Sequence, residues 1–378
     1  MTSTGGLSRR RVGGTSSSSA TSDDASNGGW GSSNGPALNG TAGSHAGSAF
    51  EGGSKIAYDP RDLDRDKEET RQGGKMPRLT IMEEVLLLGL KDKQGYLSFW
   101  NDNISYALRG CILIELALRR RIALVKDANR RRNPLPDRLV EVIDDRQTGE
   151  TILDETLRMM KGQESDKISI NGWIDLLSGE TWNVMKIGYQ LKQVRERLAK
   201  GLVDKGVLRT EKRNFLLFDM ATHPVADVRT KEAIISRVVS LLTAATSTVP
   251  PSALDKEGTQ CRVMRSVCLA CAAYAASVLD NAFGRLTYED REGAFQRCDD
   301  VLAEFACWPF GSASATGTGS SRRRETVRIG MGSNPATGRE SVLGLLQEVK
   351  KEMNGEEDLG FELVAGVLEV LSKLDSLL

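Results

Sequence analysis

Histidine is scarce in this sequence, because only His45 and His223 occur among 378 residues. A histidine-rich metal site is therefore excluded, and a nucleophile–histidine–acid triad could use only His223. No GxSxG, P-loop or HExxH motif occurs, and no GxGxxG stands in a strand–helix–strand setting. The simpler interpretation of His223 is a histidine satisfied in a buried turn beside Pro224. We therefore expect no enzymatic activity, no metal and no cofactor.

Net charge and paired cysteines are also missing. Lys plus Arg and Asp plus Glu number 51 each, which argues against a protein that coats nucleic acid over its whole surface. A local basic patch stays possible. The six cysteines lack zinc-site spacing and lie mostly in apolar helical patterns. We expect them to be buried, reduced thiols of a cytosolic protein.

The sequence has no long apolar run. No stretch reaches the roughly 18 apolar residues that a membrane span needs. The longest candidate, Cys111 to Leu118, contains Glu115 and is followed by three arginines. We find no secretory signal pattern or prenylation box, and Thr2 after Met1 excludes N-myristoylation. We therefore expect any membrane contact to be peripheral.

Composition predicts a tail followed by one folded domain. Residues 12–54 are dominated by Gly and Ser and follow the basic cluster Arg9-Arg10-Arg11. Such a segment buries too little apolar area to offset the entropy of ordering it. We expect residues 1–77 to be disordered and residues 78–378 to form a helical domain. Within that domain, the Gly/Ser/Thr-rich residues 311–338 are typical of a surface loop.

The pattern of the remaining chain predicts a mainly α fold: a central helix bundle ringed by amphipathic helices, with a few short β-hairpins. Thr80 and Glu83 fit a capping box that opens a helix through Leu90. The next helix, from Ile104 to about Leu118, is apolar on most of its circumference, which implies burial. Residues 122–125 and 139–143 are expected to be strands, followed by a turn into a short extended piece at 151–153. Further helices are expected at 154–161, 169–178, 184–204, 230–246, 258–282, 287–306, 340–353 and 358–377.

A basic segment runs from Lys192 to Arg213, with eight cations and three acids. Lys192 and Arg195 are three residues apart, so on one helix they share a face. Such a charge run is most often a solvated face. The alternative is that the two cations converge on a phosphate, to which a guanidinium adds bidentate geometry.

Two residues outside this segment also admit two interpretations. Trp100 follows a strand-like piece, and it either packs in the core or lies at the headgroup level of a bilayer. Arg109 interrupts an apolar helix, so it either meets an internal acid or faces an anion pocket. Gly110 beside it would let a bulky headgroup approach the helix backbone.

The segment 207–218 predicts a hairpin, with strands at 207–209 and 215–218 around a polar turn at 210–214. Its second strand is apolar on both faces. It either packs in the core or, because its flanks are cationic, inserts into lipid or contacts a neighbouring subunit. A helix followed by a short basic hairpin also resembles the wing of a winged helix, which keeps a nucleic-acid-binding protein as the alternative function.

Four stretches resemble the Golgi phosphoprotein three family, whose fungal members are vacuolar-sorting adaptors. They read LTIMEEVLLLGL at 79–90, GYLSFWNDNISYALRG at 95–110, QLKQVRERLAK at 190–200 and NFLLFDM at 214–220. The matches are nearly continuous and span roughly 78 to 310. The resemblance implies a helical domain that binds phosphatidylinositol 4-phosphate on Golgi membranes.

The resemblance also implies roles for particular residues. The headgroup site of the family falls on Trp100, Arg109, Lys192 and Arg195. Its hydrophobic hairpin, associated with membrane contact and self-association, falls on Val207, Leu208, Phe215, Leu216, Leu217 and Phe218. An N-terminal arginine cluster that contacts the COPI coat in fungal members is matched by Arg9, Arg10 and Arg11.

The function that the resemblance implies is that of a peripheral adaptor on the cytoplasmic face of Golgi membranes, with a cytosolic pool. It would link the cytosolic tails of Golgi glycosyltransferases to the COPI coatomer, which keeps those enzymes in the Golgi by retrograde transport. The expected ligand is phosphatidylinositol 4-phosphate, the expected assembly is a homo-oligomer, and no nucleic acid is expected as a partner.

Overall fold

The computed structural model describes residues 74–97, 103–180, 184–215, 218–244, 246–313, 335–355 and 357–374. Contacts divide the chain into Met1–Ser44 and His45–Leu378, and all described residues belong to the second unit. The predicted boundary after residue 77 stays a prediction. The described helices are α2 (Ile81–Gly89), α3 (Asn103–Leu118), α4 (Thr151–Gly162), α5 (Ile170–Ser178), α6 (Val194–Asp204), α7 (Val228–Thr243), α8 (Arg262–Ala275), α9 (Leu279–Ala282), α10 (Tyr288–Phe305), α12 (Pro335–Glu352) and α13 (Leu359–Ser372).

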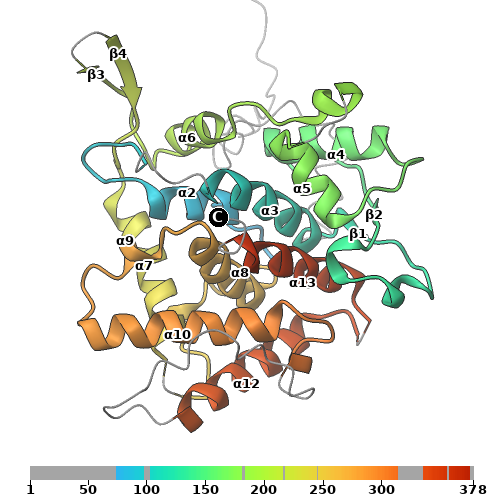
Figure 1. The fold of residues 1–378 in the computed structure, drawn as a ribbon. Helices are drawn as coiled ribbons and strands as arrows, with labels where there is room; N and C mark the ends of the chain where they lie inside the picture. The colour runs from blue at the N-terminus through green and yellow to red at the C-terminus, as the bar shows by residue number, and fades with distance from the viewer. Residues whose placement is uncertain are drawn as a thin grey trace, which may run out of the picture. The chain divides into compact units, whose positions relative to one another are not determined.

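Helix α3 lies at the centre of this unit, against α2, α5, α8 and α13 (Figure 1). Leu108, Ile112 and Leu116 on successive turns have no exposed surface. A helix that is hydrophobic all round must have neighbours on every side. The predicted helix and its burial are therefore confirmed.

Helix α2 begins as its sequence predicts. The Thr80 hydroxyl accepts from the Glu83 backbone N–H at 3.3 Å, and the Glu83 carboxylate accepts from the Thr80 N–H at 2.9 Å. This reciprocal pair satisfies two N–H groups that a helix start leaves without a partner. The capping box fixes where the chain enters the core.

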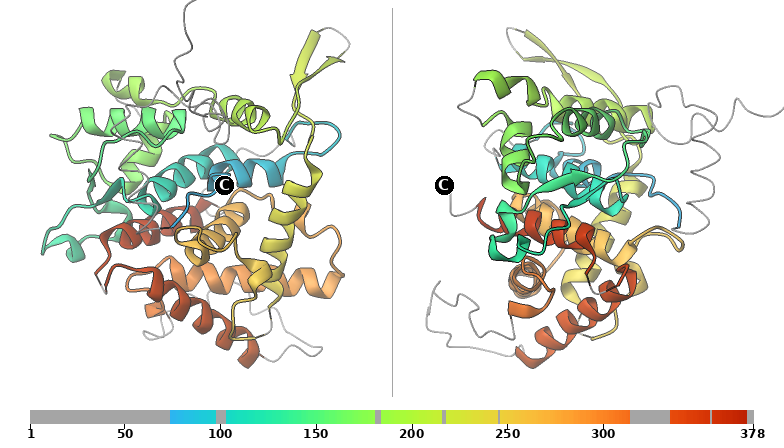
Figure 2. Two further views of the ribbon diagram at one scale, coloured as in Figure 1. Left: turned by 180° about the vertical axis from the view of Figure 1, so that it is seen from behind. Right: turned by 90° about the vertical axis from the view of Figure 1, so that its right-hand side faces the viewer.

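Amphipathic helices flank the central ones (Figure 2). Helices α4, α5 and α6 lie on one side of α3, and α10 and α12 lie beyond α8 and α13 on the other (Figure 1). Helix α10 buries Ala294, Cys298 and Val301 while its acidic side chains face outward. The predicted fold class is confirmed. Among the described helices, none is long and apolar enough to cross a membrane.

Two small antiparallel sheets complete the described structure. In the first, β1 (Ile122–Leu124) pairs with β2 (Val140–Val142), close to the strands predicted at 122–125 and 139–143. In the second, β3 (Glu211–Phe215) pairs with β4 (Phe218–Thr222).

Several predicted boundaries are wrong. Residues 151–153, predicted as extended, form the first turn of α4, and residues 335–338 of the predicted loop form the first turn of α12. The predicted helix 258–282 is interrupted, because Ser277 between α8 and α9 has a φ of 54°. A left-handed residue cannot continue an α-helix.

The predicted helix 184–204 is also interrupted. A 3-10 turn, η4 (Val184–Tyr189), is followed by a short turn, and α6 begins only at Val194. Gln193, the residue before α6, has a φ of 53°, in the left-handed region. Lys192 therefore precedes α6, and the prediction that Lys192 and Arg195 share one helix face is wrong.

The hairpin is displaced from its predicted position. Residues 211–214, predicted as part of the turn, lie in β3, and Phe215 pairs with Phe218. Val207 and Leu208 precede β3 and are 0% and 2% exposed in the core. Their assignment to a membrane or oligomerisation hairpin is therefore corrected, because a core side chain cannot reach lipid or another subunit. Leu216 and Leu217 lie outside the described residues.

Candidate functional site

Arg109 is the centre of the candidate site. Its side chain lies on α3, only 7% of the residue is exposed, and it is oriented by backbone carbonyls. The guanidinium donates to the carbonyl oxygens of Ser105 at 2.8 Å, Leu191 at 2.9 Å and Leu177 at 3.4 Å. The carbonyls come from α3 itself, from the end of α5 and from the turn before α6. Three segments therefore hold one guanidinium.

Among the described residues, no carboxylate forms an ion pair with Arg109. Burial lowers the pKa of its guanidinium, the neighbouring charge of Arg195 lowers it further, and Glu196 acts in the opposite direction. Carbonyl oxygens satisfy the N–H groups, but they do not neutralise the charge. A buried charge requires a counter-charge to be stable. Of the two interpretations of Arg109, the internal acid is excluded for the described part of the chain, and the geometry suits an external anion.

Arg195 lies close to this guanidinium, Lys192 follows a residue that the guanidinium contacts, and both cations are exposed. Lys192 follows Leu191, whose carbonyl accepts from Arg109 and whose N–H donates to the Leu177 carbonyl at 3.0 Å. Arg195 lies in the first turn of α6 and is close enough to affect the pKa of Arg109. The structure thus brings together three of the four predicted headgroup residues, although the two exposed cations lie on a turn and a helix.

The other predicted site residues lie outside the described part of the chain. Trp100 and the cluster Arg9, Arg10 and Arg11 belong to residues that the structure does not describe. Trp100 stands between two described elements, the turn at 91–95 and helix α3. The predictions for these four residues stay predictions.

The turn at 91–95 is fastened to the base of the β3–β4 hairpin. The Gly95 carbonyl accepts from the His223 N–H at 2.9 Å, and the Arg213 guanidinium donates to the Lys93 carbonyl at 2.5 Å. Gly95 has a φ of +69°, and a Cβ there would lie 2.3 Å from the Pro224 nitrogen. Only glycine fits this contact. The hairpin base and the segment that leads to Trp100 are therefore held together.

Two neighbouring residues were interpreted from the sequence. His223 is half-buried beside the buried Pro224, and burial lowers the pKa of its imidazole. Its interpretation as a turn residue without a catalytic role stays a prediction. A Cβ on Gly110 would lie 3.0 Å from Leu371 and 3.2 Å from Val367, both on α13. The expectation that Gly110 admits a headgroup is wrong, because this glycine allows two helices to pack closely.

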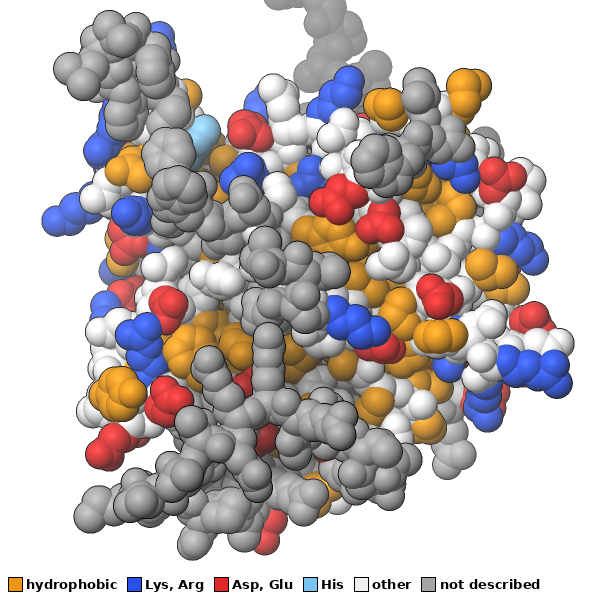
Figure 3. Space-filling view, viewed as in Figure 1, with side chains coloured by type: hydrophobic (Ala, Val, Ile, Leu, Met, Phe, Trp, Pro, Cys, Tyr) orange, Lys and Arg blue, Asp and Glu red, His pale blue; other side chains and the backbone are white. Residues whose placement is uncertain are grey.

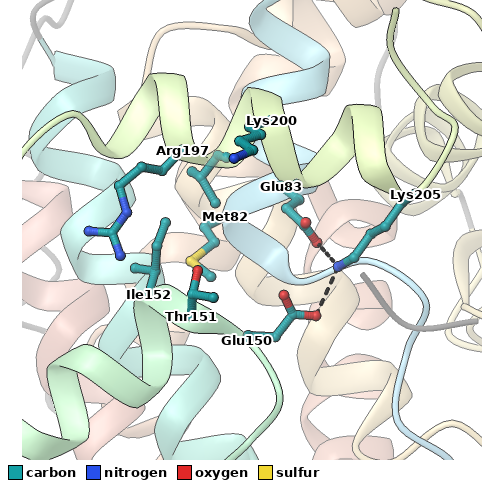
Figure 4. A pocket seen from close by; sticks show the side chains of 10 residues that line it. Met82, Glu83, Glu150, Thr151, Ile152, Arg197, Lys200 and Lys205 are labelled. Atoms are coloured by element: carbon teal, nitrogen blue, oxygen red, sulfur yellow. Dashed lines mark hydrogen bonds and ion pairs between the residues drawn. The ribbon is translucent and has the colours of Figure 1, made fainter. Parts of the chain in front are cut away.

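A separate hollow of about 220 Å³ lies between α2, α4 and α6 (Figure 4). The Lys205 ammonium is buried in it and contacts the carboxylates of Glu83 and Glu150, each at 2.8 Å. Its charge is thus neutralised from within, unlike that of Arg109. We interpret the hollow as part of the scaffold. No group of His, Cys, Asp or Glu side chains suited to a metal ion occurs among the residues that the structure describes.

Sequence reasoning missed one feature near Arg109. Met185 and Ile187 on η4 are 88% and 47% exposed. The segment was predicted as part of a continuous helix, in which one apolar face would be buried. The order Met185-Lys186-Ile187, just before Lys192, was the signal that could have identified it.

Comparisons with known proteins agree with the resemblance in the sequence. The model of the Golgi phosphoprotein 3 (GPP34) family matches residues 81–316. Vacuolar protein sorting-associated protein 74 of Schizosaccharomyces pombe is 52% identical over 338 residues, which cover 89% of this chain and 93% of that protein. The protein of the same name from Eremothecium gossypii is 49% identical over 325 residues, 86% of this chain and 90% of that protein. The chain belongs to the Golgi phosphoprotein 3 (GPP34) family.

Proposed function

We propose that this chain is a peripheral Golgi membrane adaptor that binds phosphatidylinositol 4-phosphate and acts in protein sorting. The observation that carries the proposal is the buried guanidinium of Arg109, which has carbonyl partners but no carboxylate partner in the described structure. A phosphate monoester supplies the missing negative charge. The family and the names of the two relatives support the Golgi and sorting parts of the proposal.

Arg109, Lys192 and Arg195 contact the phosphate in different ways in this proposal. Arg109 is pre-oriented by the carbonyls of Leu177 and Leu191, so it loses little side-chain freedom on binding. Lys192 and Arg195 are exposed and close around the phosphate from the solvent side. A charge-assisted hydrogen bond contributes about 1.5–3 kcal/mol, so two or three such bonds give reversible binding.

Membrane contact adds to headgroup binding. In this proposal Trp100 lies at the headgroup level, where an indole ring is partly apolar and partly wet. The tip of the β3–β4 hairpin, at residues 215–218, also inserts in this proposal. The hydrogen bond from the His223 N–H to the Gly95 carbonyl ties the base of the hairpin to the turn at 91–95.

The adaptor half of the proposal rests on the family resemblance. Arg9, Arg10 and Arg11 bind the COPI coat, and the folded unit holds the cytosolic tails of Golgi glycosyltransferases for retention and retrograde transport. The chain catalyses no reaction and needs no cofactor in this scheme. Self-association of several copies multiplies weak contacts through effective concentration, so each contact can be modest.

Flotation with liposomes tests the lipid-binding part. The unchanged protein is expected to float with vesicles that contain phosphatidylinositol 4-phosphate and to stay at the bottom with phosphatidylinositol. Arg109→Ala and Lys192→Ala are expected to lose flotation. Lys200→Ala removes an exposed cation of α6 that lines the separate hollow, and it serves as the matched control. If Arg109→Ala floats as well as the unchanged protein, the assigned site is wrong.

A pulldown tests the adaptor part. Immobilised chain is expected to retain coatomer and glycosyltransferase tails from a Golgi extract. Replacement of Arg9, Arg10 and Arg11 by alanine should release coatomer while the tails stay bound. Retention of coatomer by that variant would contradict the role of the arginine cluster.

A further inference from the structure

The 3-10 turn η4 exposes apolar side chains on a segment that is otherwise well anchored. Met185 is 88% exposed and Ile187 is 47% exposed. Isolated exposed apolar residues are common on protein surfaces, but a neighbouring pair on a projecting turn marks a contact surface more often. Figure 1 places this turn, in bright green between α5 and α6, at the same upper edge as the β3–β4 hairpin.

Contacts at both ends hold η4 in place. At its start, Gly179 ends α5 with a φ of +85°, which turns the chain away from that helix. At its end, the Tyr189 ring contacts the buried Trp173 edge-on, with centroids 6.5 Å apart. The Gln190 side chain then donates to the Ser178 carbonyl at 3.3 Å. The contacts of Tyr189 and Gln190 therefore hold the end of η4 against α5, next to the exposed Ile187.

The same segment builds the Arg109 site. The chain leaves α5 just after Leu177, runs through η4 and returns at Leu191, and the carbonyls of both leucines accept from the Arg109 guanidinium. The turn η4 therefore belongs to the loop whose two ends hold the Arg109 guanidinium. We expect a membrane that presents a ligand to Arg109 to lie close to Met185 and Ile187 as well.

The charges around the turn favour an anionic surface. The exposed cations Lys192 and Arg195 follow at the end of the turn, while Lys186, between the two apolar residues, forms an ion pair with Asp166 at 3.9 Å. Figure 3 shows hydrophobic and cationic side chains at the upper right of the molecule, with acidic side chains among them. Apolar side chains flanked by lysine and arginine are typical of segments that enter the headgroup region of anionic bilayers.

We propose that η4 is a second membrane-inserting element, in which Met185 and Ile187 enter the bilayer that presents the phosphorylated headgroup to Arg109. The inference rests on the proposed function and deepens it, because it makes the site selective for a headgroup within a membrane over the same headgroup in solution. The anchored turn loses little conformational freedom when it inserts.

The test separates membrane insertion from headgroup recognition. Met185→Gln and Ile187→Thr remove apolar surface without adding charge, and each is expected to weaken binding to vesicles with phosphatidylinositol 4-phosphate about tenfold. The double variant is expected to lose about 100-fold if the effects add. Affinity for soluble inositol 1,4-bisphosphate should stay within about twofold. Leu343→Gln, at an exposed leucine of α12, is the matched control and should leave both affinities unchanged.

Each outcome has one meaning. If the unchanged protein binds vesicles with phosphatidylinositol 4-phosphate no better than vesicles with phosphatidylinositol, the proposed function fails. If it binds but the double variant keeps its vesicle affinity, the insertion of η4 is wrong while the headgroup site stands. If the double variant keeps vesicle binding but loses self-association in sedimentation velocity, the turn is an interface between copies of this chain and the inference is overturned.

Discussion

Helix α3 carries two buried charged side chains, Glu115 and Arg109, whose partners differ in kind. Glu115 is fully buried and is paired with Arg119 at 2.7 Å and Arg265 at 2.9 Å. Arg109, earlier on the same helix, is nearly as buried but has only carbonyl partners among the described residues. Both charges are costly to bury. The charge of Glu115 is neutralised by arginines of the fold, whereas we assign the counter-charge of Arg109 to a ligand.

The surroundings of Glu115 explain why it is structural. Burial alone would raise the pKa of its carboxyl, but Arg265 and Arg119 outweigh burial and hold that pKa well below its ordinary range. Its carboxylate also accepts from the Ile81 N–H at 3.1 Å, at the start of α2. The cluster thus ties α2, α3 and α8 together. The comparison teaches that a buried charge identifies a site only when the fold leaves it without a counter-charge.

The largest expected effect comes from breaking the neutralised cluster. Glu115→Gln leaves Arg265 buried without its partner, so we expect the free energy of unfolding to fall by about 3–5 kcal/mol at pH 7. Urea unfolding measures this loss. The loss should shrink in acid, because a group with a lowered folded pKa contributes stability above its unfolded pKa and loses it as the pH falls. A loss below about 1 kcal/mol would contradict the structural role.

Glu84 lies between these two cases, because its buried carboxylate forms an ion pair with one arginine, Arg237. Burial raises the pKa of Glu84 to about 7, and its ion pair with Arg237 only partly opposes that rise. The folded state therefore binds the proton more tightly than the unfolded state, so this group stabilises the protein at low pH. Its contribution is lost as the pH rises from about 4.5 to 7 and amounts to about 3 kcal/mol.

Glu84→Gln should remove that part of the pH dependence. We expect the free energy of unfolding of the variant to fall less steeply between pH 5 and 7 than that of the unchanged protein. Urea unfolding at several pH values gives the two slopes. Parallel slopes would mean that Glu84 titrates normally, and the contrast with Glu115 would then be lost.

Removal of the Arg109 charge should change the free energy of unfolding only slightly. Arg109→Met removes hydrogen bonds to three carbonyls, at about 0.5–1.5 kcal/mol each, although the Leu177 carbonyl keeps the Leu191 N–H as a donor. The change also removes a buried charge whose desolvation is unfavourable. We expect the free energy of unfolding to change by less than about 2 kcal/mol, well below the loss for Glu115→Gln. A loss as large as that of Glu115→Gln would place Arg109 among the structural charges.

The smallest effects are expected at the exposed cations. Lys192→Ala and Arg195→Ala should change the free energy of unfolding by less than about 0.5 kcal/mol, because neither side chain is buried. Each should lower headgroup affinity about tenfold, and more at low salt than at high salt. Lys200→Ala on the same helix α6 should change neither quantity, and titrations at two salt concentrations check all three variants.

Local rules predicted much of the fold. The capping box at Thr80 and the apolar circumference of α3 are short-range signals, and both elements were placed to within about two residues. The break before α6 was missed because its left-handed residue is Gln193 rather than glycine or asparagine. The hairpin was displaced because its polar strand β3 looks like a turn, and Phe215 to Phe218 contains no turn residue.

The site was predictable only in part. Cations such as Lys192 and Arg195 can be identified in a sequence, Arg109 stands out because it interrupts an apolar helix, and the resemblance assigned all three to one site. That Arg109 is held by the carbonyls of Leu177 and Leu191 follows from tertiary packing alone. Every residue carries a carbonyl, so backbone partners leave no trace in the sequence.

Calorimetric titration with inositol 1,4-bisphosphate tests the central claim most directly. Arg109→Met is compared with Arg138→Met, which removes a buried arginine that the fold already pairs with Glu362. We predict that Arg109→Met lowers headgroup affinity at least tenfold, while Arg138→Met destabilises the protein but binds within about twofold of the unchanged chain. Equal affinity of Arg109→Met and the unchanged protein would contradict the claim that this charge is held for an anion.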